Sequence, residues 1–278
     1  MYESFYGLTA KPFAIVPDPR FIYWGGPHSI AFTMLEYGIL SHAGFTVITG
    51  EIGAGKTTLI RHLLSRLPTD INVGFLPGVF GSQGQLLQWV LMAFGQPFEG
   101  LSDVSLFRNF QSYLMEQHEL GKRNVLIVDE AQTLGARLLE ELRLISNVNT
   151  YEKELLQIVL SGQPELKQLL AAPEMVQFAQ RISSDFHLTS LTREQVADYI
   201  WHRLKEAGGT TFLFSLEAVN LIHFATHGTP RLINTLCETS LMYGYAAGAE
   251  LVTTEIVQRV IDDKNQHGVV PLGQGMRA

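Results

Sequence analysis

Three glycines, a lysine and a threonine lie within eight consecutive residues near position 50. The segment reads Gly50-Glu51-Ile52-Gly53-Ala54-Gly55-Lys56-Thr57 and matches the pattern G-x-x-x-x-G-K-[ST] in full. Glycines let the backbone curl so that its N–H groups face phosphate oxygens, while the lysine reaches the β- and γ-phosphates and the hydroxyl binds Mg²⁺. We therefore expect residues 50–58, including Thr58, to bind ATP, with Lys56 on the phosphates and Thr57 on the metal ion.

Two adjacent carboxylates, Asp129 and Glu130, follow the apolar run Val125–Val128. Open α/β sheets bind their ligands at the carboxyl ends of strands, which is where such a run would deliver both side chains. An apolar run that ends in acidic residues is common, but after a complete phosphate-binding loop it becomes specific. We expect Asp129 to hold Mg²⁺ and Glu130 to orient and deprotonate the attacking water.

A second apolar run, residues 155–160, ends in Ser161-Gly162-Gln163-Pro164. A polar side chain at this strand end could contact the γ-phosphate, although a plain turn containing glycine and proline is nearly as good an interpretation. Ser161 and Gln163 are the candidates, and we favour Gln163 because its side chain reaches further.

Two arginines are candidates for neutralising charge on the transferred phosphate. Arg181 precedes the last expected strand, at a sheet edge open to another subunit, although it could equally be an ordinary surface arginine. Arg231 follows Thr229, a good helix N-cap, and Pro230, a good first helical residue, so it falls in a first turn where the helix dipole disfavours a cation. A nucleotide phosphate or a nearby carboxylate would compensate it.

The pattern of apolar residues indicates the elements that position these side chains. Strands are expected at residues 45–49, 72–76, 125–128, 155–161 and 186–191, separated by sequence with helical periodicity or loop character. This alternation predicts an α/β fold with a mainly parallel sheet covered on both faces. Helices are expected at residues 28–41, from Lys56 to about residue 67, from Thr192 through a capping box with Gln195, and at 215–227, 230–246 and 254–264.

These elements divide the chain into four parts. Residues 1–27 are an aromatic and proline-rich lead-in, residues 28–191 the α/β nucleotide-binding core, residues 192–267 a helical lid, and residues 268–278 a flexible tail. The lead-in is expected to pack on the body of the protein, with a partner or membrane contact as the less favoured alternative.

Composition excludes several classes of protein. The chain has 278 residues, 46% of them hydrophobic and 17% charged, which predicts a folded globular protein. A net charge of −7 without a block of basic residues counts against a large nucleic-acid surface. The single cysteine, Cys237, excludes an internal disulfide and is expected in the core, and no histidine set has metal-ligand spacing. With neither a signal peptide nor a run of about 20 apolar residues, the chain is expected to be cytoplasmic.

Taken together, the motifs resemble those of bacterial AAA+ ATPases of the general secretion pathway protein A type, nearly from end to end. The resemblance is carried by Phe5-Tyr6-Gly7-Leu8, Lys11-Pro12-Phe13, Pro17-Asp18-Pro19, His28, the loop at Gly50, Asp129-Glu130-Ala131-Gln132, Gly162-Gln163-Pro164-Glu165-Leu166 and Gly228-Thr229-Pro230-Arg231. It implies a sheet of order 5-1-4-3-2, a helical lid and nucleotide bound between subunits of a ring or filament. It also implies that Gln163 is sensor 1, Arg181 the arginine finger and Arg231 sensor 2.

Three functions are compatible with these residues. The favoured one is a cytoplasmic ATPase, able to reach the inner membrane through partners, that drives or switches assembly of an envelope secretion or exopolysaccharide-export system. Relatives of the secretion type typically continue into a membrane span and a periplasmic region, whereas this sequence ends shortly after the expected lid. The resemblance therefore does not lead us to expect a periplasmic role. The alternatives are an ATP-dependent DNA-binding regulator similar to those of transposition, and an assembly protein that binds ATP and scarcely hydrolyses it.

Overall fold

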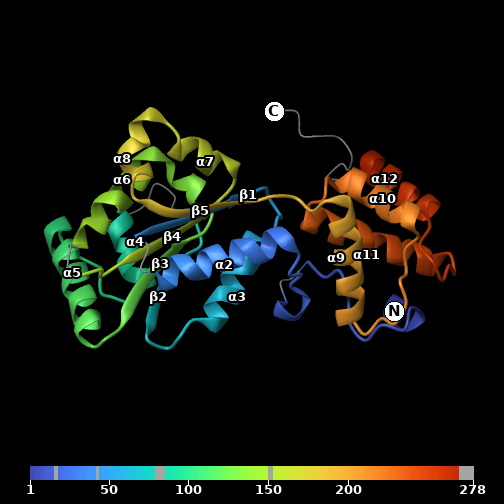
Figure 1. Ribbon diagram of the computed structural model, residues 1–278, viewed down its shortest axis with the longest axis horizontal. Helices are drawn as coiled ribbons and strands as arrows, with labels where there is room; N and C mark the ends of the chain where they lie inside the picture. Colours follow the sequence, from blue (N-terminus) through green and yellow to red (C-terminus); the bar gives the residue numbers. More distant parts are fainter. Residues whose placement is uncertain (16–17, 42–43, 79–84, 150–152, 269–278) are drawn as a thin grey trace. The chain divides into compact units, whose positions relative to one another are not determined.

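The computed structural model of the chain describes residues 1–15, 18–41, 44–78, 85–149 and 153–268 (Figure 1). These residues form two compact units. Unit 1 comprises Met1–Ser29, Glu51–Thr58 and Thr189–Ala278, and unit 2 comprises Ile30–Gly50 and Leu59–Leu188. Pro17 and residues 269–278 of the expected tail lie outside the described residues.

Unit 2 contains a five-stranded parallel sheet in the order β2-β3-β4-β1-β5, which confirms the predicted order and fold class. Its strands are β1 (Phe45–Gly50), β2 (Ile71–Leu76), β3 (Arg123–Val128), β4 (Gln157–Gly162) and β5 (Ile182–Leu188). The three central strands are buried almost throughout, because helices cover both faces of a parallel sheet and no face is left for polar residues.

The last strand begins four residues earlier than the sequence predicts, at Ile182 and not at Phe186. It lies at the edge of the sheet, where β1 is its one neighbour. An edge strand tolerates outward polar side chains such as Ser183 and Asp185, so the apolar pattern is weak in its first half and the strand was placed too late.

Helices cover both faces of the sheet. On one face pack α4 (Leu86–Ala93), α5 (Asp103–Glu119), α6 (Gly135–Ile145), α7 (Pro164–Leu170) and α8 (Val176–Ala179), with the short turns η2 (Ala131–Leu134), η3 (Ser146–Val148) and η4 (Pro173–Met175). The other face receives α2 (Gly26–Leu40), where a Cβ on Gly38 would overlap the side chain of Thr46. The helix α3 (Lys56–Arg66) follows the glycine loop.

Unit 1 is a bundle of four helices with the N-terminal segment packed into its core. The helices are α9 (Arg193–Glu206), α10 (Leu216–Thr226), α11 (Pro230–Ala246) and α12 (Thr254–His267). The predicted capping box between Thr192 and Gln195 opens α9. The N-terminal segment carries α1 (Tyr2–Phe5) and η1 (Pro19–Phe21), and Tyr6, Phe13 and Phe21 are buried among the lid helices.

A buried arginine fastens this N-terminal segment to α9. Arg203 is 8% exposed, and its guanidinium donates hydrogen bonds to the carbonyl oxygens of Pro12 and Ala14 and lies 4.7 Å from the ring centroid of Phe21. The carbonyls and the aromatic face replace the water that a buried cation loses. The described residues of the lead-in thereby pack as part of unit 1. Among the described residues, no helix is both long and apolar enough to cross a bilayer.

Candidate active site

The phosphate-binding loop follows β1 and ends where α3 begins, at Lys56. Gly53 and Gly55 have φ angles of 81° and 108°, in the left-handed region that favours glycine. The Ala54 N–H donates to the Glu51 carbonyl at 3.1 Å, which closes the turn, and the ammonium of Lys56 donates to the same carbonyl at 3.0 Å. The loop therefore has the curled backbone that presents N–H groups to an anion.

His28 supports this loop from the first turns of α2. Its Nε2 lies 2.9 Å from the Ala54 carbonyl oxygen, and a Cβ on Gly55 would come within 3.1 Å of the same nitrogen. The ring is 8% exposed, and burial lowers the pKa of His28 below its ordinary value, so the imidazole is neutral at pH 7. Because a carbonyl only accepts, Nε2 carries the proton that is donated to Ala54, and Nδ1 is unprotonated.

Arg231 lies beside the loop within unit 1. Its backbone N–H donates to the Gly53 carbonyl at 3.2 Å, and a Cβ on Gly53 would come within 2.5 Å of the Arg231 Cβ. Thr229 is the N-cap and Pro230 the first residue of α11, although the Thr229 side chain makes no capping hydrogen bond. No carboxylate pairs with Arg231 among the described residues, so that local alternative to a phosphate is not observed.

Asp129 follows the last residue of β3, at the edge of the sheet where β1 and β4 also end. The register pairs Val128 with Leu160, so Asp129 comes next to Ser161, and the Ser161 hydroxyl donates to Asp129 Oδ1 at 2.7 Å. Both residues are buried. Ser161 therefore orients the carboxylate that is expected to hold the metal ion, whereas Gln163, the favoured sensor, contacts Glu130.

Glu130 sits in a strained backbone conformation with its carboxylate held by two amides. Its φ of 49° is in the left-handed region, which is uncommon for a residue with a Cβ. The Nε2 groups of Gln132 and Gln163 donate to Glu130 Oε2 at 2.7 Å and 2.9 Å. Gly78 packs on the same turn, since a Cβ there would come within 2.8 Å of the Glu130 Cβ.

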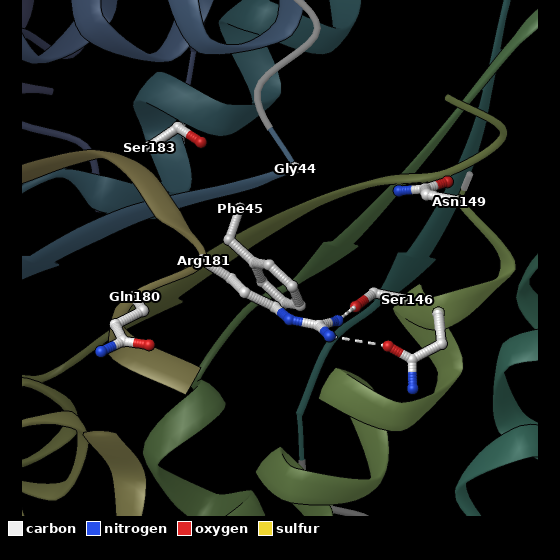
Figure 2. A pocket seen from close by; sticks show the side chains of 8 residues that line it. Gly44, Phe45, Ser146, Asn149, Gln180, Arg181 and Ser183 are labelled. Atoms are coloured by element: carbon white, nitrogen blue, oxygen red, sulfur yellow. Dashed lines mark hydrogen bonds between the residues drawn. The ribbon is translucent and has the colours of Figure 1, made fainter. Parts of the chain in front are cut away.

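Arg181 directly precedes β5, at the amino ends of the parallel strands and so opposite to the ends that carry Asp129 and Ser161. It lines a pocket of about 380 Å³ (Figure 2). Its guanidinium donates to the carbonyl of Arg143, to Ser146 Oγ and to Asn147 Oδ1, at 3.1, 2.8 and 2.7 Å. These acceptors stand at the carboxyl end of α6, where a cation complements the helix dipole. Among the described residues no carboxylate forms a salt bridge with Arg181. The pKa of Glu140 is lowered mainly by the hydrogen bond from Arg143, and the charge of Arg181 helps to lower it.

The structure thus gathers the predicted residues into two sets. Unit 1 holds the loop residues 51–58 with Arg231, and unit 2 holds Gly50, Asp129, Glu130, Ser161 and Gln163. Arg181 is also in unit 2, but it precedes β5 and so lies at the other end of the strands from these residues. Sequence reasoning quoted His28 and Gln132 as motif residues and gave them no role. The signal for Gln132 was its position two residues after Glu130, and nothing local to His28 pointed to a loop that lies far along the chain.

Comparison with known proteins places these features in context. Residues 39–170 match the family model of the AAA domain. Over 253 residues the chain is 39% identical to general secretion pathway protein A of Aeromonas hydrophila, an alignment that covers 91% of this chain and 46% of that protein. The chain therefore spans about half the length of this relative.

Solved structures with the same architecture include the ORC2 protein of Aeropyrum pernix, determined as ADPNP and ADP complexes, and Cdc6p of Pyrobaculum aerophilum. The first has a TM-score of 0.65 at 15% identity and the alignment covers 91% of this chain and 71% of that one. The second has a TM-score of 0.65 at 16% identity, with 91% and 70% covered. At such identities the likeness shows the fold alone, and the AAA-domain match over residues 39–170 agrees with it.

Proposed function

Because this chain is an AAA-domain protein and a homologue of general secretion pathway protein A, we propose that it hydrolyses ATP with Mg²⁺ to drive or switch assembly of a bacterial envelope secretion or exopolysaccharide-export system. The observation that carries the ATPase proposal is the complete phosphate-binding loop leading from β1, with Asp129 and Glu130 following β3 at the same edge of the sheet. The role in export follows from the relative alone.

The loop binds the phosphates of ATP. Its positive-φ glycines, Gly53 and Gly55, let the backbone curl in a conformation that a residue with a Cβ rarely adopts, which fits a phosphate cradle. Lys56 supplies the charge for the β- and γ-phosphates, and Arg231 approaches the same loop from the start of α11. The neutral His28 fixes the loop by its hydrogen bond to the Ala54 carbonyl.

Hydrolysis is the task of the carboxylates. A hydroxyl and a carboxylate are oxygen donors of the kind that Mg²⁺ prefers, so Thr57 and Asp129 fit as its protein ligands, and the ion would neutralise charge that develops on the phosphates. Ser161 keeps Asp129 oriented. Glu130 takes the proton of the attacking water. Gln163, which donates a hydrogen bond to Glu130, would act as the sensor of the γ-phosphate of the bound nucleotide.

Arg181 acts on the nucleotide of a neighbouring subunit in a ring or filament. It precedes the first residue of β5, whereas both carboxylates follow the last residue of β3. A strand of seven residues separates the two edges by roughly 20 Å, which is too far for an arginine to reach its own site. Arg181 would therefore stabilise the transition state of ATP hydrolysis in a neighbouring subunit, across a subunit interface. We place this assembly at the cytoplasmic side of the envelope.

The experiment that tests the ATPase proposal is the steady-state rate of phosphate release over a range of protein concentrations. Glu130→Gln should bind ATP with unchanged Kd while its turnover falls by roughly 10²-fold or more, because the general base is lost. A wild-type rate no faster than that of Lys56→Ala would overturn the proposal. A rate that rises with protein concentration supports assembly, and salt-sensitive stimulation by duplex DNA would instead favour the DNA-binding regulator.

Subunit mixing tests Arg181. Arg181→Ala subunits retain an intact nucleotide site, and Lys56→Ala subunits retain the arginine, so mixed assemblies should recover part of the activity that each variant lacks alone. Absence of any recovery, in mixtures shown to co-assemble, would leave Arg181 as a cap of α6.

A further inference from the structure

Gln132 is connected to both Glu130 and the Gln163 backbone, and its amide can face only one way. The Gln163 N–H donates to Gln132 Oε1 at 3.0 Å. A backbone N–H cannot accept a hydrogen bond, so the Gln132 oxygen must face it and the Nε2 must face the Glu130 carboxylate, which it reaches at 2.7 Å. One orientation of one side chain therefore satisfies both partners.

The neighbouring backbone makes room for this amide. A Cβ on Gly162 would come within 2.9 Å of Gln132 Oε1, so any larger residue at the end of β4 would displace the amide oxygen. Gln132 itself is half-buried in η2, the turn that directly follows Glu130. The amide is thus held by the fold on the side away from Glu130.

A glutamate side chain has three rotatable bonds, and a general base must be held within hydrogen-bond reach of the proton it takes. Glu130 Oε2 accepts from two amides that come from different parts of the chain, Gln132 in η2 and Gln163 after β4. Hydrogen bonds to an ionised acceptor are the stronger kind, and two on one oxygen restrict rotation of the carboxylate.

We propose that Gln132 is a positioning residue for the general base: it fixes the Glu130 carboxylate and couples it to the Gln163 segment. This inference rests on the proposed ATPase activity. Gln132 does not touch the nucleotide in this role, so it affects the rate of the chemical step and leaves nucleotide affinity unchanged.

Two variants separate positioning of Glu130 from simple tethering of the Gln163 segment. Gln132→Met has the same length and removes both hydrogen bonds. Gln132→Glu keeps an acceptor for the Gln163 N–H but loses the donor to Glu130 and places a second negative charge against it. Gln111→Met, on the exposed face of α5 in the same unit, is the matched control and should keep the wild-type rate.

The assay is steady-state ATPase kinetics together with ADP affinity and melting temperature. Loss of a hydrogen bond to a charged group corresponds to a fall in kcat of roughly 10- to 100-fold for Gln132→Met, with KM and the ADP Kd within about twofold of wild type. Gln132→Glu should be at least as slow. Gln132→Met combined with Gln163→Met should fall less than the product of the two single effects, because both act on one oxygen.

Three results would overturn the inference. The first is a kcat for Gln132→Met within about twofold of wild type. The second is a Gln132→Glu variant faster than Gln132→Met, which would mean that only the tether matters. The third is a parallel loss of kcat, ADP affinity and melting temperature, which would mark a structural role. Failure of the ATPase proposal is distinguishable, since then wild type itself would be no faster than Lys56→Ala.

Discussion

Replacing His28 by alanine removes the hydrogen bond that holds the phosphate-binding loop at Ala54. The bond is neutral and buried, and its loss leaves a carbonyl of the loop without that donor. Loss of such a hydrogen bond costs about 1–2 kcal/mol. Because the bond stabilises the loop conformation that is proposed to bind nucleotide, the Kd for ADP should rise roughly 5- to 30-fold. His28→Gln offers an amide N–H of similar reach and should restore much of the affinity.

The assay is calorimetric titration of ADP at pH 7.5, with the exposed His118, at the end of α5, replaced by alanine as the matched control. Affinity of His28→Ala equal to that of wild type, in a variant that melts as a folded protein, would refute the idea that His28 fixes the loop. Equal losses in His28→Ala and His28→Gln would show that the ring packing matters and the hydrogen bond does not.

The pH dependence follows from the same burial. The pKa of His28 is lowered in the folded protein, so the unfolded chain binds a proton more readily than the native one as the pH falls through the ordinary histidine range. The contribution of His28 to stability is therefore complete above an unfolded pKa of about 6.5 and is lost as the pH falls toward the folded pKa. The stability difference between wild type and His28→Gln should shrink between pH 7 and pH 5, measured by denaturant unfolding.

Three further predictions concern unit 1. Arg203→Met should destabilise the protein by about 2–4 kcal/mol in urea unfolding, because the carbonyl of Pro12 and the ring of Phe21 lose their cation, and an unchanged midpoint would contradict this. Gly228→Ala should lower stability by about 2 kcal/mol or more, since φ is 70° there and a Cβ would lie 2.0 Å from the Leu191 carbonyl oxygen; wild-type melting would refute it. Burial raises the pKa of the Cys237 thiol, so a thiol reagent at pH 8 should react only after denaturation, and fast native reaction would show that the residue is accessible.

Much of the fold follows from local pattern. The glycine loop predicts a strand before it and a helix after it. The order of the strands in the sheet is implied by the family resemblance, and the structure confirms it. The edge strand β5 was placed late because an edge strand need not be apolar on both sides. Which face each helix covers, and the packing of the N-terminal segment against α9, depend on contacts between residues far apart in the chain, which periodicity does not encode.

The candidate site was predictable as a set of residue types and less so as a set of contacts. Lys56, Asp129 and Glu130 were identified because their chemistry needs fixed neighbours in sequence. Ser161 and Gln163 were recognised as alternatives for one role, whereas the structure gives each a different carboxylate. The sequence gives no role to Gln132, because this residue binds the Glu130 carboxylate and the Gln163 N–H at the same time. These two partners come together only when β3 and β4 lie side by side.

The left-handed backbone of Glu130 makes the proposed general base a source of strain in the fold. A residue with a Cβ in this conformation costs on the order of 1 kcal/mol relative to glycine, and asparagine or aspartate tolerate it better than glutamate does. Engineering directed at thermal stability alone would therefore favour replacing Glu130 by glycine or asparagine, which have no carboxylate to act as the proposed base. Any stabilised version of this protein should be screened for turnover as well as for melting temperature, with position 130 held constant.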